Sequence, residues 1–400
     1  MSNNRISPKE YEYVKQVLDS SFRSSQGAGM TKKLEALFRE KFGVKHAIAH
    51  SNGTVTMHAG LLAAGIKPGD EVIVPPLTMA STSFAVLNCY AVPVFADVDA
   101  DTFVIDAESI RKKITPKTKA IIPVSLYGLS PDMDKIMAIA KEHNLVVLED
   151  NAQCFLGYYH GKVVGSHGDM ASYSFQSSKH MASGEGGMLT TNDDELADKI
   201  RKYNSLGYAG VSATQVKITK EDIQNPDYTR HVQHGFNFRI SELCAAVALG
   251  QLERLEELVA VRVNAAKGYD AIASQYKSVK AQRTPEGYVN SYWTYAFTLA
   301  DPAIDWHDFK KVYKSHGGDN FYAAWKLTYQ EPAFKNRTFL DPKNAFENAI
   351  YKDYTYPMGL CPVAEKLQPR MVQLKTNYFG DGEAVKRQWQ ALEKTLKHFA

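Results

Sequence analysis

Residues 146–188 read VVLEDNAQCFLGYYHGKVVGSHGDMASYSFQSSKHMASGEGGM, and this stretch decides how the chain is interpreted. Asp150 ends an apolar run that is typical of a buried strand. Lys179 follows a second such run, inside a Ser/Gly-rich segment that cannot form a packed core. An enzyme that uses pyridoxal 5'-phosphate (PLP) needs an acid that keeps the pyridine nitrogen protonated and a lysine that forms a Schiff base. The stretch therefore predicts a PLP site, with Ser174 as a candidate for holding the phosphate.

Short apolar runs alternate with helical patterns on both sides of this stretch. We expect strands at residues 46–50, 71–75, 93–98, 120–126, 145–150, 170–175 and 187–191, and helices between most of them at 54–65, 79–90, 106–113 and 131–143. Such alternation predicts an α/β fold with a mostly parallel, mixed sheet sandwiched by helices. Ligands of open α/β sheets bind at the carboxyl ends of strands, where Asp150 and Ser174 are expected to lie.

The rest of the chain predicts a second, smaller domain. Residues 7–20 and 31–42 have amphipathic helical patterns, and residues 240–274 are expected to form one long helix. We place a domain boundary inside that helix near residue 255, which gives a large PLP-binding domain (1–255) and a small C-terminal α+β domain (256–400). The polar segment 207–234 is expected to be a substrate loop or mobile flap.

Composition excludes several classes of function. The 400 residues carry a net charge of +3 without a concentrated basic patch, which argues against nucleic acid as a partner. The four cysteines show no CxxC spacing, and no signal sequence is recognisable, so a cytoplasmic protein is expected. The most apolar stretch is too short and interrupted to span a membrane, and the twelve histidines show no metal-ligand spacing.

Each candidate residue also has an ordinary structural interpretation. A lysine is usually a solvated surface charge, and of Glu149 and Asp150 only one can face the ligand crevice, because neighbouring side chains of a strand alternate. Gln153 either reaches the cofactor ring or is a surface amide. Gly53 and Thr54, in SNGTVTMH, form either an anion site at a helix N-terminus or a simple helix cap. For Asn237, in GFNFRISEL, the residues alone predict only a loop before a helix capped by Ser241.

Taken together, the motifs resemble the DegT/DnrJ/EryC1/StrS family of PLP-dependent sugar aminotransferases. The resemblance spans nearly the whole chain and includes KHAIAHSNGT, VIVPPLTMAST, VSLYGLSPDMD, VLEDNAQ, SYSFQSSKHMASGEGGM and GFNFRISELCAA. It implies the fold-type-I aminotransferase fold and a homodimer with sites at the subunit interface.

The resemblance also implies roles for individual residues. Lys179 corresponds to the Schiff-base lysine, Asp150 to the pyridinium partner and Gln153 to a residue near the ring hydroxyl. The implied phosphate ligands are Gly53, Thr54 and Ser174, with Asn237 contributed by the neighbouring subunit. Met79 departs from the family pattern, because many members have an aromatic residue there that stacks on the ring. A dehydratase branch has histidine at the lysine position, so Lys179 favours transamination.

The implied function is a ping-pong aminotransferase of amino-sugar biosynthesis. It would take an amino group from L-glutamate or L-glutamine and deliver it to a keto-sugar, expected to be nucleotide-linked. Two alternatives stay open: an aminotransferase for a small phosphorylated ketone or keto-cyclitol, and a PLP-binding regulatory protein without turnover. Arg230, Arg239 and Lys326 are candidate contacts for an anionic acceptor.

Overall fold

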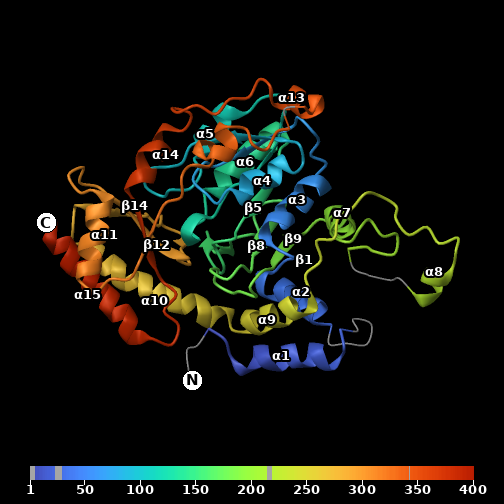
Figure 1. The fold of residues 1–400 in the computed structure, drawn as a ribbon, viewed down its shortest axis with the longest axis horizontal. Coiled ribbons are helices and arrows are strands. Elements are labelled where there is room, and N and C mark those ends of the chain that lie inside the picture. Colours follow the sequence, from blue (N-terminus) through green and yellow to red (C-terminus); the bar gives the residue numbers. More distant parts are fainter. Residues whose placement is uncertain (1–4, 23–28, 214–218, 342) are drawn as a thin grey trace.

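The computed structural model describes residues 5–22, 29–213, 219–341 and 343–400. Its described part is built around a seven-stranded sheet with the order β1-β9-β8-β5-β4-β2-β3 (Figure 1). The strands are β1 (His46–His50), β2 (Glu71–Val74), β3 (Val92–Phe95), β4 (Thr118–Ile121), β5 (Val146–Asp150), β8 (Met170–Ser174) and β9 (Gly187–Thr191). Each of the seven predicted strands overlaps one of these, and those at 46–50, 71–75, 145–150, 170–175 and 187–191 are confirmed to within a residue at either end. The strands predicted at 93–98 and 120–126 begin and end earlier, and they end at Phe95 and Ile121.

The directions of these strands place the carboxyl ends of several of them at one edge of the sheet. β9 runs antiparallel to its neighbours β1 and β8, whereas β8, β5, β4, β2 and β3 pair in parallel. Because β1 and β8 are both antiparallel to β9, they point the same way, and their carboxyl ends lie beside that of β5. This mixed, mostly parallel sheet confirms the predicted fold class.

Helices cover both faces of the sheet, as the alternation of inward side chains requires. α3 (Gly53–Ala63), α4 (Ser81–Leu87) and α7 (Asp194–Asn204) pack on the face that carries Val72, Val74 and Leu148. On the other face, α5 (Ala107–Lys113) and α6 (Met133–His143) pack against Ile73 and Val147. α2 (Met30–Phe42) and α9 (Glu242–Glu253) cover the β1 end of that face, and α1 (Pro8–Asp19) lies on α9.

A second, antiparallel sheet lies toward the C-terminus, with the order β10-β12-β14-β13. Its strands are β10 (Val279–Ala281), β12 (Thr294–Leu299), β14 (Met371–Lys375) and β13 (Tyr322–Ala323). α10 (Leu255–Ala273), α11 (Trp306–Ser315) and α15 (Gly382–His398) enclose its core, which contains Phe297, Phe309 and Leu392. A small sheet of β6 (Tyr158–Tyr159), β7 (Lys162–Val163) and β11 (Tyr288–Val289) links the two regions.

The structure differs from the sequence prediction in its later elements. The expected single helix over 240–274 is two helices, because Arg254 leaves helical geometry at φ −114° and ψ 19°. The segment with α12 (Pro332–Lys335), α13 (Ala345–Tyr351) and α14 (Pro362–Leu367) returns to the large sheet, and its Phe334 and Ala364 join that sheet's core. A boundary at residue 255 thus stays a prediction.

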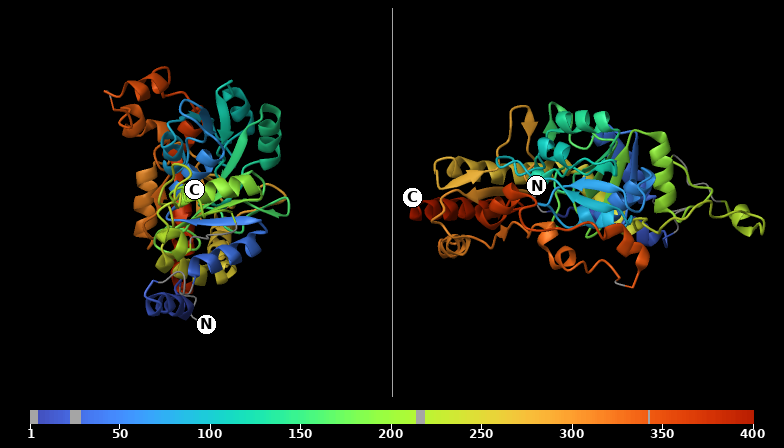
Figure 2. Two further views of the ribbon diagram at one scale, coloured as in Figure 1. Left: turned by 90° about the vertical axis from the view of Figure 1, so that its right-hand side faces the viewer. Right: turned by 90° about the horizontal axis from the view of Figure 1, so that it is seen from above.

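The described residues of segment 207–234 project from the body, and Figures 1 and 2 show α8 (Lys220–Gln224) at their far end. Residues 214–218 of this predicted loop lie outside the described residues. No helix within the described ranges combines the length and the hydropathy of a membrane span.

Candidate active site

Asp150 ends β5 as a buried carboxylate with few compensating partners. Its Oδ2 accepts a hydrogen bond from Thr82 Oγ1 at 2.8 Å, and its Oδ1 accepts one from the Ala152 N–H at 3.1 Å. Burial raises the pKa of Asp150, whereas these two hydrogen bonds and the charge of Lys179 act in the opposite direction. A cation placed against this carboxylate would therefore be strongly stabilised.

Lys179 lies beyond the carboxyl end of β8, and its side chain is 9% exposed. Its Nζ lies 4.8 Å from the centroid of the Trp293 ring. Burial lowers the pKa of Lys179 to about 8; Asp150 acts against that shift, and Arg262 acts with it. Near neutral pH an amine with such a pKa has a neutral, nucleophilic fraction far larger than that of an ordinary lysine, and a Schiff-base lysine reacts through this fraction.

The turn between β1 and α3 forms a close-fitting cradle. Asn52 caps α3 through its side chain, which accepts the Val55 N–H, so the first N–H groups of an 11-residue helix begin at Gly53 and Thr54. A Cβ built on Gly53 would lie 2.8 Å from Ser174 Cβ, too close for any side chain. The helix N-terminus and Ser174 therefore meet with room only for glycine, in an arrangement suited to an anion.

Gln153 and His180 are both buried beside these groups. Gln153 Oε1 accepts the Tyr127 N–H at 2.9 Å, which uses the amide oxygen and not the NH₂ group. His180 pairs through Nε2 with the Ser291 carbonyl at 2.9 Å, and burial followed by the charge of Arg262 holds its pKa well below the usual range. His180 is therefore a neutral, hydrogen-bonded packing residue.

The other predicted site residues are open to solvent. Met79, just before α4, is 50% exposed, and Asn237 is exposed on the segment that pairs with the end of β1. Arg230, Arg239 and Lys326 are exposed as well. The structure thus gathers Asp150, Lys179, Gln153, Gly53, Thr54 and Ser174 at one edge of the sheet, and it leaves the rest at the surface.

Three residues of this site were missed by sequence reasoning. Thr82 bonds Asp150 from α4, Trp293 lies against Lys179, and Arg262 bonds the Lys179 carbonyl from α10. Thr82 lies in a pattern of small residues and Arg262 in a helix with many charges, so neither gave a local signal. Each becomes significant only through a contact that is distant in sequence.

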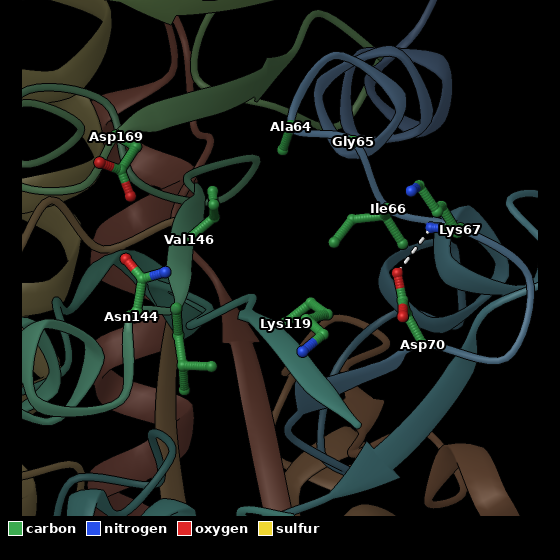
Figure 3. Close-up of a pocket in the computed structure, with 10 residues that line it drawn as sticks. Ala64, Gly65, Ile66, Lys67, Asp70, Lys119, Asn144, Val146 and Asp169 are labelled. Carbon is green, nitrogen blue, oxygen red and sulfur yellow. Dashed lines mark hydrogen bonds between the residues drawn. The ribbon is translucent and has the colours of Figure 1, made fainter. Parts of the chain in front are cut away.

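A hollow of about 480 Å³ lies at the opposite edge of the sheet (Figure 3). It is lined by residues at the amino ends of strands, including Lys119, Val146 and Asp169. The Asp169 carboxylate accepts the Val147 N–H at 2.8 Å, and the Asp70 carboxylate accepts the Lys67 N–H at 2.7 Å. These acids satisfy the backbone there, and the hollow holds none of the residues gathered at the carboxyl ends.

A buried lysine and a buried carboxylate at the carboxyl ends of this mixed sheet are the arrangement expected of a fold-type-I aminotransferase. The sequence model of the DegT/DnrJ/EryC1/StrS aminotransferase family matches residues 4–387, and the chain belongs to this family.

Relatives and solved structures agree with this family. The chain is 42% identical over 266 residues to GDP-perosamine synthase of Caulobacter vibrioides, which covers 66% of this chain and 67% of that protein. It is 38% identical over 288 residues to GDP-perosamine synthase of Escherichia coli O157:H7, covering 72% and 74%. The crystallised aminotransferase from Psychrobacter cryohalolentis superposes with a TM-score of 0.86 at 30% identity, covering 98% of each chain.

Proposed function

We propose that this aminotransferase uses PLP to move an amino group from L-glutamate or L-glutamine to a nucleotide-linked keto-sugar. The observation that carries the proposal is the buried Lys179, whose pKa is lowered to about 8 and whose charge interacts with that of Asp150. An amine with a lowered pKa attacks carbonyl groups readily. A buried carboxylate forms a charge-assisted hydrogen bond with a cationic ring nitrogen.

The residues present fit PLP in three respects. Asp150 lacks a full counter-charge, and a pyridinium nitrogen would supply it. Gly53, Thr54 and Ser174 surround a helix N-terminus, which suits the phosphate. Gln153 has its amide oxygen occupied by Tyr127, so its NH₂ group is left to donate to the ring hydroxyl.

Bound PLP supplies a carbonyl that condenses with amines and a ring that accepts electrons. Lys179 would take the proton from the α-carbon of the amino donor and return it at the cofactor, acting as general base and then as general acid. Asp150 would keep the ring nitrogen protonated throughout. Trp293 and the surrounding core would keep water from the Lys179 amine. The same groups would act in reverse order when the acceptor ketone is aminated.

The names of the relatives favour a GDP-linked sugar as the acceptor. Proteins named GDP-perosamine synthase in three organisms are 42%, 38% and 32% identical to this chain. An amino sugar arises by transamination of the corresponding ketone, so GDP-perosamine is a suitable amino donor for the reverse half-reaction. Exposed Arg230, Arg239 and Lys326 are candidate contacts for the diphosphate.

The decisive experiment is an absorbance spectrum of the PLP-loaded protein before and after addition of glutamate, glutamine or GDP-perosamine. Conversion of the visible band by an amino acid and by GDP-perosamine supports the whole proposal. Conversion by an amino acid but not by GDP-perosamine would support transamination and would favour a phosphorylated ketone or keto-cyclitol as the acceptor. A Lys179→Ala control should show no conversion, and wild-type protein without a visible band would overturn the assignment of Lys179.

We also propose a homodimer in which Asn237 serves the site of its neighbour. Exposed Asn237 and the projecting helix α8 fit a role outside the protomer. Mixing Lys179→Ala and Asn237→Ala chains tests this, because each mixed dimer would regain one intact site, about a quarter of wild-type activity in a random mixture. Mixtures without recovered activity would place Asn237 in its own site or in none.

A PLP-binding regulatory protein is the second candidate. A relative from Geobacillus stearothermophilus that is named pleiotropic regulatory protein is 40% identical over 274 residues. Retention of the visible band with every amino donor would favour this candidate over the enzyme.

A further inference from the structure

Arg262 is a large, fully buried side chain that reaches from α10 to the loop of Lys179. It is 2% exposed. Its Nη2 donates to the carbonyl oxygens of Ser178 at 2.9 Å and Lys179 at 3.0 Å, and its Nη1 donates to the carbonyl of Trp293 at 2.7 Å. One planar guanidinium thus joins α10, the Lys179 loop and the residue that covers the Lys179 amine.

Arg5 approaches the same loop from the N-terminal segment. Its Nη2 donates to the Lys179 carbonyl at 2.8 Å, and its Nη1 bonds the Ser177 carbonyl. The guanidinium carbons of Arg5 and Arg262 lie 5.6 and 5.9 Å from the centroid of one ring, that of Phe379. Two guanidinium groups therefore donate hydrogen bonds to the main-chain carbonyl oxygen of Lys179.

No acid is among the hydrogen-bond partners of Arg262 in the part of the chain that the structure describes. Among the residues that the structure describes, its hydrogen-bond acceptors are three backbone carbonyls and the Thr376 hydroxyl, and no carboxylate pairs with it. Burial, followed by the charge of Arg5, lowers the pKa of Arg262 to about 9, which still leaves it charged near neutral pH. Buried charges are normally paired, so an unpaired one beside a candidate reacting group calls for a function.

We propose that Arg262, together with Arg5, is a positioning residue for Lys179: it fixes the Lys179 main chain and places an uncompensated positive charge beside the Lys179 amine. The inference rests on the proposed function in one respect, that Lys179 is the reacting amine.

The charges around Lys179 determine what this arrangement does. Asp150, from β5, and Glu185, from the loop before β9, favour the ammonium form, whereas Arg262, from α10, favours the neutral amine. His180 is neutral, and Trp293 presents its ring face. Without the charge of Arg262, only burial opposes the two acids, and the amine is protonated more fully at neutral pH.

Two substitutions separate the charge from the hydrogen bonds. Arg262→Gln removes the charge and keeps an amide NH₂ that can donate to carbonyls, whereas Arg262→Lys keeps the charge and loses the planar fork. Lys267→Gln is the matched control, because it removes a cation from an exposed position of the same helix.

The main measurement is the acylation of Lys179 in the full-length protein without PLP, quantified by peptide mass over a range of pH. We expect Arg262→Gln to lower Lys179 labelling at pH 7 about tenfold, with Arg262→Lys and Lys267→Gln close to wild type. In PLP-loaded protein, the pH midpoint of the visible absorbance should also move upward in Arg262→Gln. Arg262→Lys should lower kcat with little change in donor KM.

An Arg262→Gln profile that matches wild type would overturn the proposal. If this variant does not fold, Arg5→Gln, at a half-buried position, is expected to shift labelling in the same direction by a smaller factor, and an unchanged profile would again overturn the proposal. Loss of PLP binding or transamination in the wild type would instead count against the proposed function and would leave the titration of Lys179 interpretable.

Discussion

Glu149 and Asp150 are consecutive residues of β5 whose carboxylates serve opposite faces of the sheet. Glu149 accepts the N–H groups of Gly165, His167 and Gly168 at 2.7–2.8 Å, which anchors the loop before β8. Asp150 instead accepts from Thr82 on the helix that follows β2. The alternation of a strand thus gives one acid a structural role and leaves the other for the site.

Glu149→Gln should destabilise the fold, whereas Asp150→Asn should not. In Glu149→Gln, one oxygen becomes an NH₂ group facing backbone donors, and we expect the free energy of unfolding to fall by about 2 kcal/mol. Asp150→Asn removes a poorly compensated buried charge, so its free energy of unfolding should match or exceed that of the wild type. Its turnover should fall at least about a hundredfold. Urea unfolding and steady-state kinetics on both variants test this, and equal losses of stability would contradict the separation.

Lys179→Met should stabilise the protein while abolishing PLP capture. The folded-state pKa of about 8 lies below the ordinary lysine value of 10.5, so the folded state gives up this proton more readily than the unfolded chain. The penalty for burying the ammonium is therefore complete below pH 8 and disappears as the pH rises toward 10.5. Methionine fills similar space without charge, so the free energy of unfolding of Lys179→Met should exceed that of the wild type by about 2–3 kcal/mol at pH 7.

The difference in unfolding free energy between Lys179→Met and wild type should shrink steadily above pH 8. A difference that is independent of pH would show that Lys179 does not titrate in this range. Exposed Lys267→Met is the control and should show no such trend.

Breaking the ion pair of Glu35 and Arg201 by removing one partner should strongly destabilise the fold. The two guanidinium nitrogens of Arg201 donate to the two Glu35 oxygens at 2.7 and 2.9 Å, and Glu35 also accepts the Ala49 N–H. The pair is buried and ties α2, α7 and β1 together. Removing one partner leaves the other charge buried, so Glu35→Gln should cost about 3–5 kcal/mol.

Asp19→Asn is the matched comparison, because the Lys15–Asp19 pair is exposed on both sides. Its loss should change the free energy of unfolding by less than about 1 kcal/mol. Similar losses for the two variants would mean that burial does not set the strength of these pairs.

The large sheet was predictable because each strand carries its own apolar pattern. VVLED and MASYS are short, β-rich and bounded by turn residues, and Asp150 marks the end of one of them. α7 was missed even though Asp193 caps it, because its polar residues conceal a narrow apolar stripe of Ala197 and Ile200. The segment over 324–371 was unpredictable because its short elements are held by the large core and not by their own periodicity.

A site residue could be predicted only where the neighbouring sequence indicated its chemical role. Lys179 and Asp150 lie next to strand ends, so pattern and chemistry indicated the same place. Arg262 is 83 residues from Lys179 and lies in a helix that reads as amphipathic. Its burial without an acid is a property of the folded chain, because it depends on which elements α10 packs between.

Gly53→Ala should impair phosphate binding without unfolding the chain. The new Cβ would lie 2.8 Å from Ser174 Cβ, so the α3 N-terminus or the end of β8 must shift by several tenths of an ångström. Because this shift moves the N–H groups that would face the phosphate, we expect PLP affinity to fall about tenfold or more. Pyridoxal, which lacks the phosphate, should bind the variant and the wild type alike. Gly382→Ala, at the first turn of α15 with nothing within 4 Å of its Cβ, should bind both compounds normally. An equal loss of PLP and pyridoxal affinity in Gly53→Ala would mean that the cradle holds the ring and not the phosphate.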